Sequence, residues 1–396
     1  MKEKIKIAFA HSNINHNTEG LMEGISNYMH TKGDWQLIVW PDSSQKSLLH
    51  LKKRGCKGAF VSIQTTAKAK ELLPVGIPMI AVSTLQDTAS IPFISANPEE
   101  IAQMASEYFL KRKFKNFAFF GLTQAKWSRE RMDHFFNYLA KTGYNADIFK
   151  EKQIPVTNDS IPFAKLWVNT AFDTGQEELT KWLRRLPKPT AILASCDIFA
   201  CHLINVAKEA GLNVPDEIAI LGVNNDQAIC NTCDPPLSSI AFNFKRVGYD
   251  AAKLLDKLIA GRETMQGQRI DIQPTHIENR GSTDVFAIDD VDIVQALKYI
   301  RQNSNKSLQV NEIANQVYTS KRSLQLKFHK AVGRSIHEEI IRAHFENAKT
   351  MLIETDLPID EIAGRSGFLY TSNMRRAFKQ FAGMLPQKYR RMYRTQ

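Results

Sequence analysis

Two kinds of hydrophobic pattern divide the chain. Over about its first 280 residues, short runs rich in β-branched and aromatic residues alternate with stretches of helical periodicity. The runs predict strands at 4–10, 36–40, 58–62, 79–82, 93–95, 116–121, 191–195 and 218–223, and the periodic stretches predict helices at 18–30, 101–112 and 129–142. Such alternation is typical of parallel sheets covered by helices on both faces. Because about 280 residues exceed one comfortable core, we expect two α/β lobes.

The last 112 residues show helical periodicity, and they repeat themselves. With offsets of 49 or 50 residues, Ile313-Ala314 recurs as Ile362-Ala363, Leu324 with Phe328 recurs as Met374 with Phe378, and Gly333 recurs as Gly383. Each copy predicts two short helices joined by a turn, the first copy at 310–316 and 320–331 and the second at 359–365 and 371–380. This arrangement indicates two helix-turn-helix units.

The second helix of each unit presents side chains that suit DNA. If Leu324, Phe328, Met374 and Phe378 face the core, polar residues of both helices face outward. The predicted DNA-binding residues are Lys321, Arg322, Ser323, Gln325, Lys327, Thr371, Ser372, Asn373, Arg375 and Arg376, and Lys379 shares their outward phase. Arg reads guanine, Asn and Gln read adenine, and Ser, Thr and Lys bind phosphates. A merely solvated helix face explains one copy but is a weak explanation when both copies share one phase.

The two units are joined by a helical stretch that sets their spacing. Residues 336–355 predict a helix of about 30 Å, close to the ~34 Å between successive major grooves on one DNA face. One chain is therefore expected to cover about two turns of the duplex.

Charge supports a polyanionic partner for the repeated region. Residues 285–396 hold 18 Lys and Arg against 11 Asp and Glu, a net +7 of the chain's +11. A positive field on one domain favours nucleic acid or an anionic membrane surface, although a solvated face explains the charge alone equally well. No apolar run approaches the ~18 residues of a membrane span, and the N-terminus lacks a secretory apolar core. The five cysteines suit a reducing compartment, so we expect a soluble cytoplasmic protein.

Polar side chains follow several of the predicted strands, where ligands bind in open parallel sheets. The candidate ligand-binding residues are Ser12, Asn13, Asn97, Arg131, Asp197, Asn224 and Asn225. Amides, a carboxylate and a guanidinium match the donors and acceptors of a neutral polyhydroxyl ligand, and Trp127 or Phe172 could cover its apolar face. About half of such Asn and Asp residues serve only as helix caps or turn formers.

Catalytic and cofactor motifs do not follow any predicted strand. Phosphate-binding glycine loops, G-x-S-x-G and H-E-x-x-H are all absent from the sequence, so we expect neither an enzyme nor a cofactor. Cys230 and Cys233 have C-x-x-C spacing and Cys196 follows a neighbouring strand, but a second ligand pair is lacking, so no metal is expected.

The first region, about residues 4–280, resembles the sugar-sensing core of the lactose-repressor family and of periplasmic sugar-binding proteins. The resemblance implies a periplasmic-binding-protein-like α/β fold with two parallel-sheet lobes. It also implies that a polar residue after the first strand, Arg131 and the residue at position 224 hold the ligand. Two positions depart from that family: Asn224 stands where Asp is usual, and Cys196 where Asn often precedes the residue matched by Asp197.

The second region, about residues 291–394, resembles the DNA-binding domains of the AraC/XylS family. The matching positions are Ile362-Ala363, Gly367-Phe368, Phe378, Gly383, Pro386 and Tyr389-Arg390. The resemblance implies an all-α domain with two helix-turn-helix motifs. Met374 replaces the usual Phe, and His344 stands where Arg or Lys is common, which alters packing or a phosphate contact.

A sugar-sensing core followed by an AraC-type domain resembles the family of bacterial xylose operon regulators, with further matches at Trp127, Glu130-Arg131, Asp197 and 280–284. The resemblance implies an activator that binds promoter DNA and a monosaccharide, xylose being favoured, as a homodimer that works with RNA polymerase. We expect a sensor domain at 1–282, a linker at 283–290 and a DNA-binding domain at 291–396. Another monosaccharide, a sugar-binding protein without a DNA role and, more weakly, a sugar-modifying enzyme are the alternatives.

Overall fold

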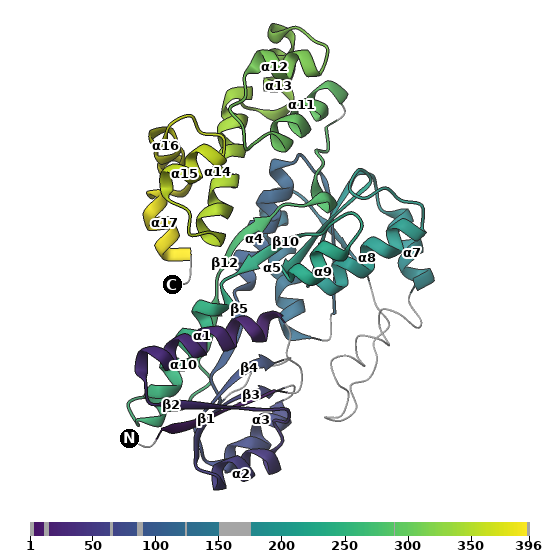
Figure 1. The fold of residues 1–396 in the computed structure, drawn as a ribbon. Helices are drawn as coiled ribbons and strands as arrows, with labels where there is room; N and C mark the ends of the chain where they lie inside the picture. The colour runs from purple at the N-terminus through teal and green to yellow at the C-terminus, as the bar shows by residue number, and fades with distance from the viewer. Residues whose placement is uncertain are drawn as a thin grey trace.

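The computed structural model describes residues 4–11, 16–63, 66–84, 90–122, 125–149, 176–288 and 290–393. They form two α/β lobes and a helical domain that lies at one end of the molecule (Figure 1). The prediction of two parallel-sheet lobes followed by an all-α domain is confirmed.

The first lobe contains a six-stranded parallel sheet in the order β11-β5-β4-β3-β1-β2. Its strands are β1 (Ile5–Ala10), β2 (Trp35–Trp40), β3 (Cys56–Ile63), β4 (Met79–Thr84), β5 (Phe93–Ala96) and β11 (Arg269–Ile272). Alternate residues of β1 point to opposite faces of the sheet. Ile7 and Phe9 pack against α1 (His16–Lys32) and α10 (Phe244–Ile259). Ala8 and Ala10 pack on the other face, which is covered by α2 (Gln45–Lys53), α3 (Thr66–Leu72) and the short helix η1 (Leu73–Val75). Both faces are buried, which explains why the strands read as continuous apolar runs.

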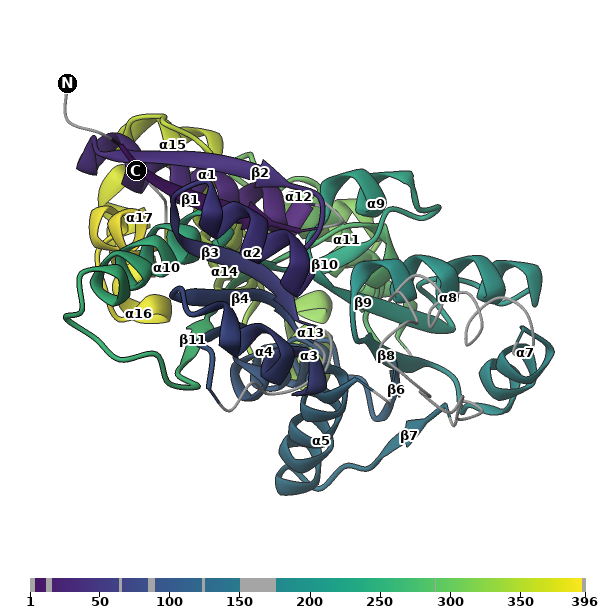
Figure 2. The same cartoon turned by 90° about the horizontal axis from the view of Figure 1, so that it is seen from below.

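The second lobe repeats this construction with the order β12-β10-β9-β8-β6-β7. Its strands are β6 (Asn116–Phe120), β7 (Ala146–Ile148), β8 (Thr190–Ala194), β9 (Ile218–Asn224), β10 (Ser238–Phe242) and the antiparallel β12 (Pro274–Glu278). One face packs against α4 (Pro98–Lys111) and α5 (Lys126–Lys141), and the other against α7 (Gln176–Arg185), α8 (Asp197–Glu209) and α9 (Gln227–Thr232). Figure 2 shows α5 and α8 on opposite sides of this sheet.

The described chain crosses between the lobes three times. It passes from β5 to α4 at Asn97, from β10 to α10 at Asn243, and from β11 to β12 at Gln273. Asn97 and Asn243 are the N-caps of the helices that follow them, and the backbone N–H of Asn97 donates to Ile272 O at 3.0 Å. A backbone hydrogen bond therefore joins two of the three crossings, and the three together form the hinge between the two sheets.

Helices α1 and α10 of the first lobe approach each other with glycine between them. A Cβ on Gly24 would overlap the carbonyl oxygen of Lys245, and a Cβ on Gly248 would overlap that of Leu21. Only glycine lets the two backbones come this close.

The junction between the second lobe and the helical domain is buried. Ser282 and Thr283, within the short helix η2 (Gly281–Thr283), are both 0% exposed. Ser282 Oγ accepts from Ser238 N at 2.8 Å and donates to Ile220 O at 2.7 Å. Val285 packs into the second lobe, whereas Phe286 packs into the helical domain. The boundary between the two hydrophobic cores therefore falls between Val285 and Phe286.

The helical domain contains α11 (Val291–Gln302), α12 (Val310–Gln316), α13 (Lys321–Val332), α14 (Ile336–Glu354), α15 (Ile359–Arg365), α16 (Thr371–Ala382) and α17 (Pro386–Tyr393). The predicted helix pairs and their facing are confirmed, since Leu324, Phe328, Met374 and Phe378 are each 0% exposed. The repeat extends to the backbone, because Gly333 and Gly383 end α13 and α16 in the left-handed conformation.

The turn inside each unit requires a positive φ. Tyr318 supplies it in the first unit (φ 52°) and Gly367 in the second (φ 87°). A Cβ at Gly367 would lie 2.6 Å from His344 Nε2, so the second turn has no room for a side chain. Tyr318 is 97% exposed and adopts this conformation at some cost in backbone energy.

Within the described part of the chain, the helices are too short or too polar to cross a bilayer.

Gly24→Ala tests the close approach of α1 and α10. We expect it to lower the free energy of unfolding by about 1–3 kcal/mol or more, because the added methyl group forces the helices apart. Chemical denaturation of the full chain measures the change. Asn27→Ala, an exposed position on the same helix, is the control and is expected to stay within about 0.5 kcal/mol of the original protein. Equal stability of the two variants would contradict the packing argument.

Candidate ligand site and nucleic-acid interface

Four predicted ligand residues come from the second lobe, and three of them are buried near the ends of its strands. Arg131 on α5, Asp197 at the start of α8 and Asn225 after β9 are 7%, 2% and 8% exposed. Arg131 Nη1 donates to the carbonyl oxygen of Ser195, and its guanidinium lies 5.0 Å from the ring centre of Trp127. Asn224 is the last residue of β9.

Asp197 is a buried carboxyl group held by two donors. It accepts from Ser239 Oγ on β10 and, at 2.7 Å, from the backbone N–H of Asp226. Loss of water raises the pKa of Asp197 to about 7, although both hydrogen bonds oppose the shift. Burial also lowers the pKa of Arg131, to about 10, so the guanidinium remains charged at neutral pH. The site thus combines a fixed cation with a carboxyl group that titrates near neutrality.

Asn224 and Asn225 follow β9 in an uncommon backbone conformation. Their φ values are 113° and 53°, a region that Asn tolerates better than most residues. The N–H of Asn225 donates to Ser239 Oγ at 3.0 Å, whereas its side-chain Oδ1 is buried without a hydrogen-bond partner. A buried acceptor without a donor costs stability unless a ligand or water supplies one, which suits a ligand with hydroxyl groups.

Other predicted residues are placed differently. The side-chain oxygen of Asn97 accepts from the N–H groups of Glu99 and Glu100 at 3.1 and 3.3 Å, so it caps α4 at the hinge. Ser12, Asn13 and Phe172 lie outside the described residues. A ligand contact for these positions stays a prediction.

Sequence reasoning missed two features of this region. Ser239, which binds both Asp197 and Asn225, is a polar residue in the buried strand β10, and such an exception in an apolar run is a usable signal. Glu130 on α5 of the second lobe lies 3.7 Å from Arg269 on β11 of the first lobe. This ion pair links the lobes beside the buried cluster.

The first predicted recognition helix, α13, presents its polar residues as expected. Lys321, Arg322 and Gln325 are exposed, and Ser320 caps the helix by accepting from Ser323 N at 3.2 Å. Lys327 is exposed but already paired, because its ammonium group lies 2.8 Å from Asp292 and 3.7 Å from Asp290. The hydrogen bond to Asp292 raises the pKa of Lys327. To bind a DNA phosphate, Lys327 must first leave Asp292 and Asp290.

The second recognition helix, α16, carries Ser372, Arg375, Arg376 and Lys379 on its exposed face. Thr371 and Asn373 are half-buried, and Thr371 Oγ1 donates to Asp360 Oδ1 at 2.7 Å, which ties α16 to α15. A hollow of ≈ 370 Å³ lies beside the exposed guanidinium groups and is lined by Ile359, Arg375, Arg376, Lys379, Leu385, Pro386 and Gln387.

Helix α14 separates the two units and fixes their spacing. Its 19 residues span about 28 Å, and a Ser335–Glu338 capping box begins it. His344, one of the two departures from the AraC/XylS pattern, is 5% exposed; its Nε2 lies 3.0 Å from Lys306 O and its ring packs edge-on against Phe368. Burial lowers the pKa of His344, so it serves packing between the units. Met374, the other departure, is a core residue.

Comparison with known proteins agrees with this architecture. A periplasmic binding protein-like domain model matches residues 106–283, and a helix-turn-helix domain model matches residues 313–392. The chain is 29% identical to the xylose operon regulatory protein of Haemophilus influenzae over 321 residues, 79% of each chain. It is 26% identical to that of Escherichia coli K12 over 378 residues, 93% of each chain.

Solved structures show the same fold. A xylose-binding transcription activator superimposes with a TM-score of 0.59 at 24% identity, and the match covers all of both chains. The lac repressor dimer bound to operator superimposes with a TM-score of 0.54 at 18% identity, and this match covers 71% of this chain and 95% of the repressor chain. The repressor therefore matches a part of this chain, whereas the activator matches both domains.

The fold, the buried polar cluster and the two exposed recognition helices define a class of protein: a DNA-binding transcription regulator in which a two-lobed sensor precedes paired helix-turn-helix units. Within this class the chain resembles the XylR-type regulators, because its similarity to xylose operon regulatory proteins extends across both domains in the same order. These relatives are transcription regulators, which confirms the expectation that the chain is not an enzyme.

The titration of Asp197 predicts a pH dependence of stability. Because folding raises its pKa from 3.8 to about 7, the fold favours the protonated form; that contribution is complete below pH about 4 and is lost as the pH rises through about 7. Asp197→Asn cannot titrate, so we expect its free energy of unfolding to fall less between about pH 5 and pH 8 than that of the original protein.

Urea denaturation followed by tryptophan fluorescence at both pH values measures the difference in slope. Asp234→Asn, which changes an exposed carboxylate, is the control and should leave the slope unchanged. Equal losses of stability in Asp197→Asn and the original protein over this range would contradict a raised pKa of Asp197 in the folded state.

Proposed function

We propose that a monosaccharide, with xylose as the favoured effector, binds between the two lobes and changes how the paired helix-turn-helix units engage promoter DNA. The observation that carries the proposal is the buried cluster of Arg131, Asp197 and Asn225, in which Asn225 Oδ1 is without a hydrogen-bond partner. The names of the relatives, which are xylose operon regulatory proteins and a xylose-binding transcription activator, support this effector.

The chemistry of the cluster suits a sugar. Each hydroxyl group both donates and accepts, so it needs partners of both kinds when it leaves water. Arg131 donates, Asn225 Oδ1 accepts, and Asp197 accepts when ionised. Trp127, beside Arg131, supplies an apolar surface for the C–H face of the sugar ring.

The hinge provides a route from ligand to DNA. Asn243, where β10 crosses to α10, donates from its side chain to Tyr393 O at the end of α17, at 2.9 Å. Closing the lobes around a sugar moves this crossing and the helix attached to it. The sugar shifts DNA binding only by its different affinity for the open and closed arrangements.

Further features of the proposal rest on family likeness. We infer a homodimer from the sensor fold shared with the lac repressor dimer, and dimerisation brings four helix-turn-helix units to one promoter. We also propose that the protein is an activator that works with RNA polymerase in the cytoplasm, as the activator with the same fold suggests.

A different monosaccharide is the second candidate effector, and one observation favours it. Asn224 stands where sugar-sensing members of the lactose-repressor family usually carry Asp, so the acceptors around the ligand differ. A thermal-shift comparison of pentoses and hexoses on the full chain decides between them. A response to xylose supports the first candidate, and a response to another sugar alone supports the second.

Arg131→Ala tests the ligand site. We expect it to abolish the thermal shift produced by the effector sugar, because the buried cation that binds its hydroxyl groups is lost, while DNA affinity without sugar is preserved. Arg185→Ala removes the same charge from an exposed position on α7 and should keep the sugar response. A full sugar response in Arg131→Ala would contradict the assignment.

Arg375→Ala tests the recognition helix. Loss of one base-reading or phosphate-binding Arg is expected to weaken promoter binding by about 1–3 kcal/mol, roughly 5- to 150-fold, with the sugar-induced thermal shift unchanged. Fluorescence anisotropy with labelled promoter DNA at several salt concentrations measures this loss. Arg185→Ala again serves as the charge-matched control. Unchanged DNA affinity of Arg375→Ala, with the protein folded, would contradict a DNA-reading role for α16.

A further inference from the structure

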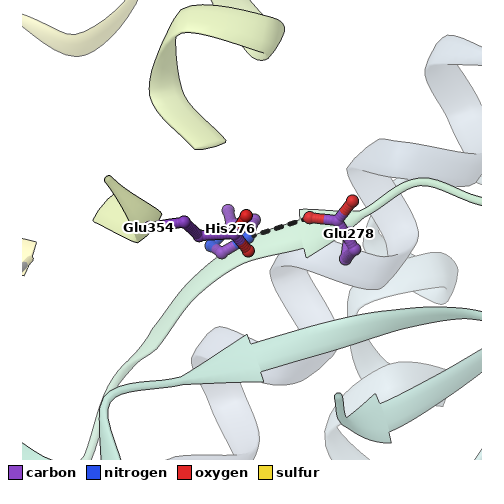
Figure 3. A group of neighbouring side chains, drawn as sticks. All are labelled: His276, Glu278 and Glu354. Atoms are coloured by element: carbon purple, nitrogen blue, oxygen red, sulfur yellow. Dashed lines mark ion pairs between the residues drawn. The ribbon is translucent and has the colours of Figure 1, made fainter. Parts of the chain in front are cut away.

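Three potential metal ligands meet where the sensor touches the DNA-binding domain. His276 and Glu278 are two residues apart on β12, so they lie on the same side of that strand. Glu354, the last residue of α14, reaches the same point from the DNA-binding domain (Figure 3). One ligand atom of each residue lies within 4.8 Å of the others.

Neighbouring hydrogen bonds determine which nitrogen of His276 carries the proton. Thr275 Oγ1 donates its single proton to Ala241 O at 3.1 Å, so it accepts from His276 Nδ1, which lies 3.1 Å away. A neutral His276 therefore has its proton on Nδ1 and a free lone pair on Nε2. This is the arrangement of a metal-binding histidine whose other nitrogen is held by an outer partner.

The lone pair of His276 faces an acceptor. His276 is 4% exposed, its Nε2 is without a hydrogen-bond partner, and Glu278 Oε2, also without one, lies 3.4 Å away. Two buried acceptors that face each other are unfavourable unless a cation lies between them. Either a second proton on His276 or a metal ion satisfies both groups.

The third carboxylate increases the demand for positive charge. The carboxylate of Glu354 places a second negative charge within 4.8 Å of the ligand atoms of His276 and Glu278. Arg280 donates to Leu237 O at 2.9 Å, which directs part of its guanidinium to the backbone of the second lobe. Glu354 is exposed, so ions reach the cluster from solvent and its side chain has room to move inward.

We propose that His276, Glu278 and Glu354 bind one divalent transition-metal ion, best matched by Zn²⁺, which joins the sensor to the DNA-binding domain. One imidazole nitrogen and two carboxylate oxygens are suitable zinc ligands at about 2.0–2.2 Å, and water completes the four positions. The imidazole disfavours Ca²⁺ and Mg²⁺, which prefer oxygen ligands. Because the ligands come from both domains, the bound ion stabilises this placement of α14 against β12.

The test is a competition titration of Zn²⁺ against a chromophoric chelator on the full chain. We expect one ion per chain, and we expect Glu354→Gln to weaken binding more than 10-fold because a ligand is lost. Glu361→Gln, a partly exposed carboxylate elsewhere in the DNA-binding domain, is the matched control and should keep the original affinity. Thr275→Val removes the outer partner of His276 and is expected to weaken binding about 10- to 100-fold without removing a ligand.

Cobalt substitution identifies the ligands independently. Co²⁺ in this site should give visible ligand-field bands without a thiolate charge-transfer band, because nitrogen and oxygen are the donors. A thiolate band would assign the ion to the cysteines near α8 and α9 and overturn the proposal. The proposal is also overturned if the folded chain binds no stoichiometric Zn²⁺, or if Glu354→Gln binds it as tightly as Glu361→Gln does; in either case a second proton on His276 is the cation that the cluster requires.

Discussion

The buried polar network beneath the junction is the constraint on which the rest of the molecule depends. Thr283 Oγ1 donates to Ser238 Oγ at 2.7 Å, Arg112 Nε donates to Thr283 O at 3.3 Å, and Ala287 N donates to Arg112 O at 2.9 Å. Burial lowers the pKa of Arg112 to about 9, which still leaves it charged at neutral pH. Because these groups have left water, their hydrogen bonds must be kept, and they hold the junction against β10.

This rigidity changes how the two domains are expected to communicate. A loose linker would let the DNA-binding domain move independently of the sensor, whereas here Arg301 pairs with Asp284 at 2.6 Å and covers the ring of Phe286. Contacts at Asn243 and β12 hold the other end of the helical domain. A change in the angle between the lobes therefore acts on the helical domain at two places, the junction with the second lobe and the contacts at Asn243 and β12.

The sequence predicted the helical domain more fully than it predicted the sensor site. Short-range periodicity determines which side chains of α13 and α16 are buried, so Leu324 and Met374 could be placed from the pattern alone. The same reasoning could not find that Lys327 pairs with Asp292, because that contact depends on three-dimensional neighbours. The cap that Asn97 forms on α4 is local, and the sequence left it open beside a ligand contact. Strand β12 also escaped prediction, since it begins with a proline and mixes polar and apolar residues.

The three crossings between the lobes contrast with the single passage into the helical domain. Each lobe is assembled from separate stretches of the chain, so neither can be cut out or exchanged as one continuous gene segment. The helical domain is continuous after Val285, and one recombination point there separates it whole. The topology thus lets a sensor of this kind be inherited only as a complete unit. A different DNA-binding domain can be joined to it by a single recombination.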